Sequence, residues 1–528
     1  MTTKPLAVFD RDWEWKQLQG FVDGKGLGVV SGRRRHGKSF LLRQLSTDRK
    51  GFYHQAIELD RRPALDRFAS ALAEHYGWPA APRFNDWEQA LRAAFSNTAP
   101  VERPGLVVLD EFPYLLKGAP ELLSVVQLLV DDWRADGARH NLILCGSSLS
   151  VMSTVLGAGS PLHGRATLDL NLASFDFQTA GKFWNAPDSQ TAFVVDAIFG
   201  GAPGYRELMD GRLPTLTPLV SAKSPRSSKP TNSTKSTKST KPTRVTTGKN
   251  QSTAPPSAAL DLADWLATGP LNPAHVLFSE DDYLLREESQ LTDRAHYISI
   301  LQAVAHGATT SANIAAALGR DSRSLHHSLN GLERSGFLES TDDALRDQRP
   351  VYRIVDPLVR FCRLITRPAA DRLEQQRWRE VMTERAPALQ AGIYGPHFEH
   401  LSREWTRRFA TDEQLGGQPT RVAPSVLSDA KARAKVELDV VAVRTGFNEQ
   451  PQVLAIGEAK HTASPRSIGD VVRLTHARDL VAATRSTQFD TTDIKLLLFS
   501  AAGFTEDVRA EATRRHDLIL IDLETLYT

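Results

Sequence analysis

Residues 32–39 read Gly-Arg-Arg-Arg-His-Gly-Lys-Ser, which fits the pattern G-x-x-x-x-G-K-[ST]. An apolar run at 27–30 precedes this stretch and a helical pattern at 40–45 follows it, so it joins an expected strand to an expected helix. Glycines let backbone amides curl around phosphate oxygens, and the helix amino end adds positive charge. We expect Lys38 to reach the β- and γ-phosphates of ATP and the Ser39 hydroxyl to ligate Mg²⁺. The predicted nucleotide-binding residues of the loop are Gly32, Arg33, Arg34, Arg35, His36, Gly37, Lys38, Ser39 and Phe40.

A second strand pattern, Leu-Val-Val-Leu-Asp-Glu at 106–111, ends in two carboxylates. Ligands of open α/β sheets bind at the carboxyl ends of the strands, where these side chains would lie. We expect Asp110 to bind nucleotide-associated Mg²⁺ and Glu111 to act as the general base that positions the attacking water.

A third strand pattern, at 142–145, leads into Gly-Ser-Ser at 146–148. Ser147 is the candidate for sensing the γ-phosphate, and the alternative is that these serines cap the next helix. Arg165, in Ser-Pro-Leu-His-Gly-Arg at 160–165, is a candidate arginine finger or else part of a surface ion pair.

Short apolar runs alternate with amphipathic stretches over residues 1–215. The expected strands lie at 27–30, 51–57, 106–109 and 142–145, with helical patterns between them. This rhythm predicts an α/β fold with a mostly parallel sheet that helices cover on both faces.

These motifs together resemble the archaeal-type AAA+ ATPase family, which is also widespread in bacteria. The resemblance covers most of the chain except residues 213–258, and it implies an ATP-binding core, a helical lid, a winged helix and a C-terminal domain. One departure is His36, where the family usually has a small apolar residue. The other is an insertion that interrupts the lid. The matching motifs are Phe9-Asp10-Arg11 with Glu14, residues 31–42, Asp110-Glu111-Phe112, Gly146-Ser147-Ser148, residues 161–165 and Gly200-Gly201-Ala202-Pro203.

The composition agrees with several folded domains. The chain has 528 residues, 41% hydrophobic and 24% charged, and its length predicts about three to four domains. No run of 18 apolar residues and no signal-peptide pattern occurs, so we expect a cytoplasmic protein with no membrane partner. The two cysteines, Cys145 and Cys362, lie in apolar sequence, which excludes a disulfide framework and a structural zinc site.

The insertion, at 213–257, contains a stretch at 221–250 that is rich in Lys, Ser and Thr and almost free of apolar residues. Eight of the chain's 64 Lys and Arg residues lie at 221–250, where there is no acid, so the rest of the chain is acidic on balance. We expect a disordered tether, or a basic arm that holds nucleic acid through phosphate contacts. The net charge of the chain alone does not indicate nucleic-acid binding.

Residues 294–366 predict three helices followed by a β-hairpin, the pattern of a winged helix-turn-helix. Polar side chains on its expected third helix, at 322–335, include Arg323 and Asn330, which are candidates for nucleic-acid contacts. The alternative is a module that only couples neighbouring domains.

Residues 380–528 predict a mixed α/β domain that starts with a helix at 397–409. Its strand at 436–443 is expected to place Glu437, Asp439 and Val441 on one face and Val436, Leu438 and Val440 on the other. The next strand carries Glu458 and Lys460. If the strands pair, the carboxylates converge, and a divalent cation would relieve the cost of burying them.

This arrangement resembles the PD-(D/E)xK nuclease core. The resemblance implies metal binding by Asp439 and Glu458, a catalytic Lys460 that orients water, and an acidic helix position at Glu399. The alternatives are a salt-bridged hairpin, in which Lys460 pairs with Glu437 or Asp439, and a nuclease-like fold without activity.

The predicted fold class is therefore α/β: a P-loop AAA+ core with a helical lid, a winged helix-turn-helix and a restriction-endonuclease-like domain. The predicted function is an ATPase whose nucleotide state controls a half that binds DNA, or another nucleic acid, and carries a magnesium-dependent nuclease site; a homo-oligomer is compatible with it. The alternatives are an ATP-dependent DNA-binding regulator with a silent C-terminal domain, and a protein-interaction switch without nucleic acid. The predicted boundaries are 1–212 for the core and first part of the lid, 213–257 for the insertion, 258–293 for the rest of the lid, 294–366 for the winged helix and 380–528 for the last domain.

Overall fold

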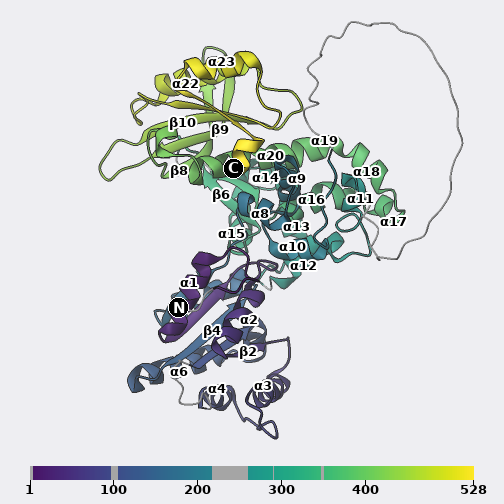
Figure 1. The fold of residues 1–528 in the computed structure, drawn as a ribbon, viewed down its shortest axis with the longest axis vertical. Helices are drawn as coiled ribbons and strands as arrows, with labels where there is room; N and C mark the ends of the chain where they lie inside the picture. Colours follow the sequence, from purple (N-terminus) through teal and green to yellow (C-terminus); the bar gives the residue numbers. More distant parts are fainter. Residues whose placement is uncertain (1–3, 97–104, 217–259, 289, 347–349) are drawn as a thin grey trace, which may run out of the picture.

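The computed structural model describes residues 4–96, 105–216, 260–288, 290–346 and 350–528. A sheet with its helices, a helical middle part and a second sheet follow one another along the longest axis (Figure 1). Most of the predicted insertion lies outside the described residues. The described residues on its two sides meet where the amide of Thr215 donates to the carbonyl of Leu260 at 2.7 Å.

The N-terminal sheet is parallel throughout, with the order β2-β3-β4-β1-β5. The sequence predicts four of its strands. The edge strand β5 was not expected because its residues alternate in polarity and are mostly only half-buried or exposed. The strands are β1 Gly26–Ser31, β2 Phe52–Gln55, β3 Gly105–Asp110, β4 His140–Gly146 and β5 Ala166–Asn171.

Helices cover both faces of this sheet, as the sequence predicts. One hydrophobic core joins the sheet to α1 and α2, and another joins its opposite face to helices α3 to α7. Cys145 lies in the first of these cores and is a free, buried thiol. The helices are α1 Asp12–Asp23, α2 Lys38–Arg49, α3 Arg61–Tyr76, α4 Trp87–Ser96, α5 Phe112–Gly118, α6 Leu122–Asp136 and α7 Leu149–Val155.

A helical layer follows, built from residues on both sides of the predicted insertion. Trp184 and Phe199 from the first side pack against Trp265 from the second. Its helices are α8 Phe177–Trp184, α9 Ser189–Phe199, α10 Pro203–Leu208, α11 Leu262–Leu266, the 3₁₀ turn η1 Val276–Ser279 and α12 Glu280–Glu287.

Three helical elements and a hairpin occupy residues 294–354. The expected third helix is a 3₁₀ turn followed by a short α-helix, and its predicted apolar face, Leu325, Leu329 and Leu332, is buried. The elements are α13 Arg294–Ala305, α14 Ser311–Leu318, η2 Ser322–Leu325, α15 His326–Arg334 and the antiparallel strands β6 Leu338–Asp342 and β7 Pro350–Ile354.

A run of short helices leads from this hairpin to the second sheet. Cys362, in this run, is free and buried. At its end α20 lies under the second sheet, where His397 meets Asp196 of α9 with 2.7 Å between Nε2 and Oδ2. The elements are α16 Pro357–Phe361, η3 Cys362–Thr366, η4 Arg367–Ala369, α17 Ala370–Glu374, α18 Trp378–Glu384, α19 Ala386–Leu389, η5 Gln390–Tyr394, α20 Gly395–Arg408 and α21 Asp412–Leu415.

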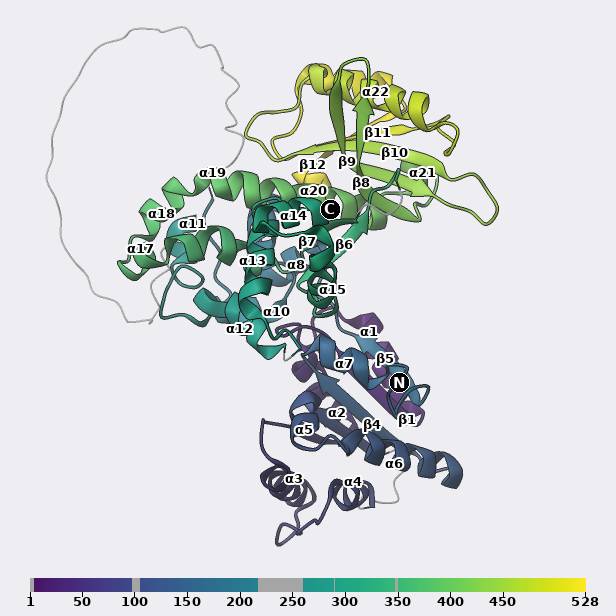
Figure 2. The ribbon, with the colours of Figure 1, turned by 180° about the vertical axis from the view of Figure 1, so that it is seen from behind.

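The second sheet has the order β12-β11-β10-β9-β8, antiparallel from β8 to β10 and parallel from β10 to β12. Helix α20 covers one face and α22 with α23 the other, as the reverse view shows (Figure 2). The elements are β8 Arg421–Asp429, β9 Ala434–Arg444, β10 Gln452–Lys460, α22 Ile468–Arg485, β11 Lys495–Ser500, α23 Glu506–Arg514, β12 Leu518–Asp522 and α24 Leu523–Tyr527.

The expected alternation along β9 is wrong. Leu438 packs in the core beneath α22, whereas Val440 packs in the core beside α20, so the two lie on opposite faces. The register between β8 and β9 shifts at Pro424, opposite Asp439 and Val440. Proline has no amide hydrogen for the ladder, and a bulge that holds one extra residue changes the direction of the side chains beyond it.

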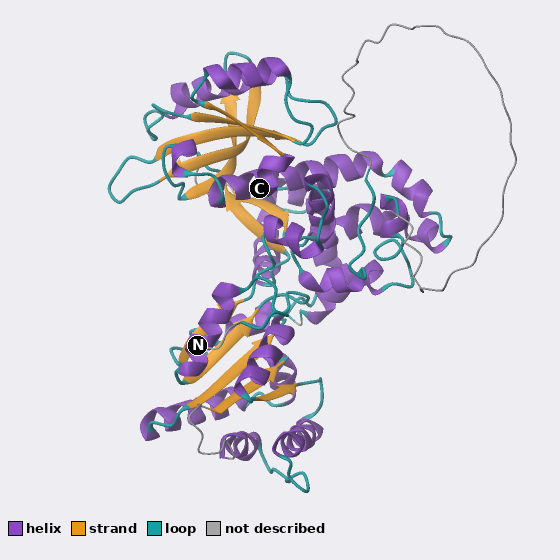
Figure 3. Ribbon diagram, viewed as in Figure 1, coloured by secondary structure: helices purple, strands orange, loops and turns teal. Residues whose placement is uncertain are grey.

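One hydrophobic core runs from α8 and α9 through the hairpin region to the α20 face of the second sheet. The alternation of helix-rich and strand-rich layers is plain when the ribbon is coloured by structure (Figure 3). Among the described helices, none combines the length and the apolar character needed to cross a membrane.

Candidate functional site

The loop after β1 has the backbone of a phosphate cradle. Gly32 has φ +149°, and a Cβ there would lie 2.5 Å from the carbonyl oxygen of Leu172, so only glycine fits. Gly37 has φ +88° and directly precedes α2. The ammonium of Lys38, which is buried, donates to the carbonyl of Arg33 at 3.0 Å. The loop and the amino end of α2 therefore have the backbone that an anion site needs, and phosphate binding there stays a prediction.

His36, the departure from the family pattern, fills a packing position in this loop. Its Nδ1 donates to the carbonyl of Leu172 at 2.9 Å. Burial lowers the pKa of His36 to about 3, and the charges of Arg33 and Lys38 act in the same direction. The imidazole is therefore neutral and adds no charge to the phosphate site.

Asp110 ends β3 beside the amino end of α2. Its carboxylate accepts a hydrogen bond from the hydroxyl of Tyr53, which also interacts with the Ser39 side chain. Burial, and then the charge of Asp110, raise the pKa of Tyr53, so the phenol stays protonated. Because one hydroxyl reaches both side chains, Ser39 and Asp110 lie close enough to share a hydrated cation. Hydroxyl and carboxylate oxygens are ligands that suit Mg²⁺.

Glu111 follows with a left-handed backbone, φ +54°. Its Oε2 accepts from the Ser147 hydroxyl at 3.0 Å. Burial, and then the charge of Asp110, raise the pKa of Glu111. A carboxylate with a raised pKa beside the phosphate site is suited to polarising water. Ser148, not Ser147, caps α7. The sensing role of Ser147 stays a prediction.

A pocket of about 510 Å³ joins these groups. Its phosphate end includes Lys38, Ser39, Glu111 and Ser147, together with Arg34. Its other end is apolar and formed by residues from the chain start and from α8. Those apolar and flanking residues are Ala7, Val8, Phe9, Leu172, Phe175, Phe183 and Pro203.

The three arginines of the loop make protein contacts beyond the N-terminal sheet. Arg33 donates to the carbonyl of Gly336 at 2.7 Å, and its guanidinium lies 4.6 Å from the ring centre of Phe337. Arg35 makes two hydrogen bonds to the Glu280 carboxylate, at 2.8 and 2.9 Å.

Arg34 contacts the same helix as Arg35. It pairs with Glu287, and its guanidinium lies 4.5 Å from the ring centre of Tyr283. All three side chains therefore join the phosphate loop to elements more than 240 residues later in the chain.

Arg165 does not reach this pocket. It directly precedes β5, at the edge of the parallel sheet opposite the phosphate loop, which follows β1. Its guanidinium makes two 2.9 Å hydrogen bonds to Asp131 of α6. Within one chain Arg165 therefore forms the surface ion pair that the sequence offered as its alternative.

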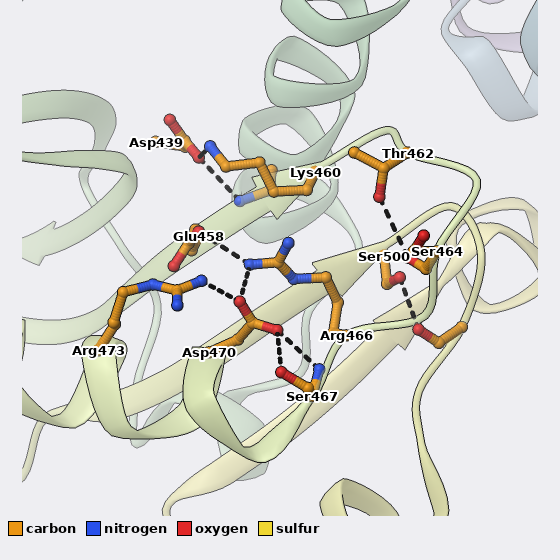
Figure 4. Close-up of polar contacts among 12 residues, drawn as sticks. Asp439, Glu458, Lys460, Thr462, Ser464, Arg466, Ser467, Asp470, Arg473 and Ser500 are labelled. Atoms are coloured by element: carbon orange, nitrogen blue, oxygen red, sulfur yellow. Dashed lines mark hydrogen bonds and ion pairs between the residues drawn. The ribbon is translucent and has the colours of Figure 1, made fainter.

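The second cluster of predicted residues lies at the middle of β9 and the carboxyl end of β10 (Figure 4). The Asp439 carboxylate accepts from the Ala459 amide at 2.8 Å and lies 3.4 Å from the Lys460 ammonium. Glu458 is held by Arg466, with 2.9 Å between Nη2 and Oε1. The structure thus brings Asp439 and Lys460 together, with Glu458 bound to a cation that the sequence did not single out.

Arg466 is the centre of a network on this side of the sheet. It also pairs with Asp470, which caps the start of α22 and is contacted by Arg473 (Figure 4). Arg466 is nearly buried. Within the described ranges, no group of three or more His, Cys, Asp or Glu side chains stands ready to hold a metal ion.

Glu399 approaches the cluster from α20. Burial, and then the negative charge of Asp439, raise its pKa to about 7. Burial lowers the pKa of Lys460, but the charges of Asp439, Glu458 and Glu399 outweigh that effect and raise it overall. Helix α20 therefore adds a third carboxyl group to the electrostatics of this site.

The two predicted nucleic-acid contacts lie on separate elements. Arg323 is exposed on the 3₁₀ turn, and Asn330 is half-buried on α15, where its side chain contacts His326 at 3.2 Å. They remain predictions.

Sequence reasoning missed two kinds of residue. Tyr53 lies in a short strand with no motif, so only its contact with Asp110 identifies it. Glu280 and Glu287 lie in an ordinary charged helix. Their role depends on a tertiary contact more than 240 residues from the loop, which no local pattern carries.

Residues 8–193 match the family model described as an ATPase domain predominantly from Archaea. This part of the chain is therefore similar to that ATPase domain. An uncharacterized protein of Methanocaldococcus jannaschii is 30% identical over 201 residues, which are 38% of this chain and 43% of that protein. The chain thus spans less than half the length of this curated relative.

Two solved structures are similar over larger shares of the chain. A Walker-type ATPase of Pyrococcus abyssi has a TM-score of 0.47 at 18% identity, over 69% of this chain and 97% of that one. The ORC2 protein of Aeropyrum pernix has a TM-score of 0.41 at 13% identity, over 73% of this chain and 97% of that one.

Proposed function

We propose that this protein is an AAA+ ATPase whose nucleotide state controls a C-terminal half that binds DNA and carries a magnesium-dependent nuclease site. The observation that carries the proposal is the contact of Arg33, Arg34 and Arg35 with later elements. Any change at the phosphate loop acts directly on α12 and on the start of the hairpin. The loop and the C-terminal half are therefore mechanically linked.

The ATPase reaction assigns a role to each residue at the phosphate end. Lys38 and the loop amides bind the phosphates, and Ser39 and Asp110 would hold Mg²⁺, which supplies charge neutralisation when bound. Glu111 accepts a hydrogen bond from the attacking water, and Ser147 holds the Glu111 carboxylate in place at 3.0 Å. Ser147 therefore senses the γ-phosphate through Glu111.

For the second site we propose metal-assisted phosphodiester hydrolysis. Asp439 and Glu458 would bind Mg²⁺, and Lys460 would orient water, with the hydrolysis relying on the charge of the cation. The two carboxylates lie on the neighbouring strands β9 and β10, and carboxylate oxygens are ligands that suit Mg²⁺. Nucleic acid would reach the site past residues 294–354, which we propose to be a winged helix-turn-helix.

Plasmid nicking with Mg²⁺ and ATP tests the nuclease assignment. We expect wild type to nick and Asp439→Ala to lose activity. Glu449→Ala, which removes an exposed carboxylate from the β9–β10 connection, is the matched control and should nick normally. Equal nicking by wild type and Asp439→Ala would refute the assignment.

The ion pairs favour a second candidate function. Both carboxylates already have a cationic partner, Lys460 for Asp439 and Arg466 for Glu458. A DNA-binding regulator with a silent C-terminal domain would retain this arrangement. It predicts DNA binding that survives Asp439→Ala and is lost on changing Arg323 and Asn330. A gel-shift salt series with no binding even at low salt would indicate a protein-interaction switch instead.

A further inference from the structure

The three loop arginines differ in how firmly they are held. Arg33 is 7% exposed and lies over the Phe337 ring. Arg35 is bonded twice to Glu280, which is itself buried. The Arg34 side chain keeps 35% of its surface exposed and pairs with one carboxylate, that of Glu287. Arg34, which also contacts the ring and hydroxyl of Tyr283, is therefore the most exposed of the three guanidinium groups.

Arg34 also faces the phosphate end of the pocket. It lines the pocket together with Lys38, Glu111 and Ser147. Its partner Glu287 lies close enough to Glu111 that each carboxylate feels the other's charge, and burial raises the pKa of Glu287 further. Glu287 is thus an unfavourable place for a full negative charge, and Arg34 compensates for it.

We propose that Arg34 is an arginine finger supplied by the chain's own phosphate loop, and that it exchanges Glu287 for the γ-phosphate of ATP. This proposal rests on the proposed ATPase function and deepens it. A phosphate dianion attracts a guanidinium more strongly than a carboxylate does, and it offers the same bidentate geometry. ADP has no γ-phosphate and would leave the pair of Arg34 and Glu287 in place.

In the hydrolysis step, Arg34 contacts the phosphoryl group that is transferred to water. The water oxygen forms a bond to the γ-phosphorus while the bond from that phosphorus to the β–γ bridging oxygen breaks. The electron pair of that bond goes to ADP, and the water proton goes through Glu111 to the released phosphate. Arg34 donates hydrogen bonds to the γ-phosphoryl oxygens and stabilises the charge that moves across them.

The exchange has a consequence for α12. When Arg34 turns to the phosphate, Glu287 is left as a half-buried carboxylate without its cation, beside Glu111 and the new phosphate charge. An unpaired buried charge is costly, so Glu287 takes a proton or moves outward with its helix. In either case the loop loses one of its two arginine ion pairs with α12, so ATP, and not ADP, would loosen α12.

Steady-state ATP hydrolysis and ADP titration calorimetry test the proposal. We expect Arg34→Ala to lower kcat by about 1,000-fold while the Kd for ADP stays within threefold of wild type. Arg34→Lys should restore little of the lost kcat, because lysine lacks the planar guanidinium that donates two parallel hydrogen bonds. Added guanidinium ion should partly restore the kcat of Arg34→Ala. Arg92→Ala, which removes an exposed ion-paired arginine from α4, is the matched control and should hydrolyse ATP normally.

The outcomes separate the two levels of the argument. If wild type hydrolyses ATP and Arg34→Ala keeps kcat within threefold of it, the finger assignment is overturned while the ATPase stands. If Arg34→Ala weakens ADP binding by as large a factor as it lowers kcat, Arg34 shapes the loop and the assignment is again overturned. If wild type neither binds nor hydrolyses ATP, the proposed function fails as well.

Discussion

The two sheets of this protein hold their acidic residues in opposite ways. In the N-terminal sheet, hydroxyl groups hold the carboxylates: Tyr53 bonds Asp110 and Ser147 bonds Glu111. In the C-terminal sheet, cations hold them: Lys460 pairs with Asp439 and Arg466 with Glu458. A hydroxyl can stay in place when Mg²⁺ arrives, whereas an ammonium or guanidinium competes with it.

Of the two proposed Mg²⁺ sites, only the C-terminal one has cations that Mg²⁺ would have to displace. The N-terminal site needs only nucleotide and cation. The C-terminal site must first redistribute its ion pairs, which is a natural point for control by the nucleotide.

Lys38→Ala should break the N-terminal site alone. Removing a buried cation from the phosphates should weaken ATP binding by about 100-fold or more and reduce hydrolysis in proportion. Titration calorimetry with Mg²⁺-ATP measures the binding. Asp439→Ala should leave ATP affinity unchanged, and a loss of affinity in that variant would contradict the separation of the two sites.

Glu111→Gln should separate binding from chemistry within the N-terminal site. The amide keeps the size of the side chain but accepts a proton poorly, so kcat should fall by about 100-fold. ATP affinity should stay within a few-fold of wild type. A variant that hydrolyses ATP at the normal rate would remove Glu111 from the proposed mechanism.

Arg466→Gln should sharpen the comparison at the C-terminal site. Taking away the guanidinium frees Glu458 and removes a competing positive charge, so Mg²⁺ affinity should rise by about tenfold. Calorimetry with Mg²⁺ in the absence of nucleotide measures it. Because Arg466 also holds Asp470, circular dichroism should first establish that α22 is intact. Weaker or unchanged Mg²⁺ binding by a folded variant would mean that Arg466 does not restrain the site.

The C-terminal site should also depend on pH. The pKa of Glu399 is raised to about 7, so this carboxyl group is neutral below that pH and negative above it. Mg²⁺ affinity should therefore rise a few-fold from pH 6 to pH 8, and Glu399→Gln should flatten the rise. A steep dependence that persists in Glu399→Gln would assign the effect to another group.

The N-terminal site could be predicted from the sequence because its residues lie in short, contiguous motifs. The phosphate loop and the strand ending in Asp110 and Glu111 are contiguous patterns, and the structure places residues 34–39 and Glu111 around one pocket. Four of the five strands of this sheet were apolar enough to recognise. The edge strand β5, with its mixed polarity, was not.

The C-terminal site was harder to predict because its geometry depends on the bulge opposite Pro424 and on Arg466, six residues beyond Lys460. Strand alternation cannot reveal a bulge, and a lone arginine carries no pattern. The contacts of Arg34 and Arg35 with α12 were invisible for a similar reason, since Glu280 and Glu287 look like solvated helix residues until the fold brings them to the loop.

The central claim is that ATP at the phosphate loop releases the contacts that hold the C-terminal half. Hydrogen–deuterium exchange of α12, Glu280–Glu287, measures this release most directly, with Glu111→Gln used to keep ATP intact. We expect its amides to exchange faster with Mg²⁺-ATP than with Mg²⁺-ADP or without nucleotide. Identical exchange in all three conditions, under saturating ATP, would contradict the account.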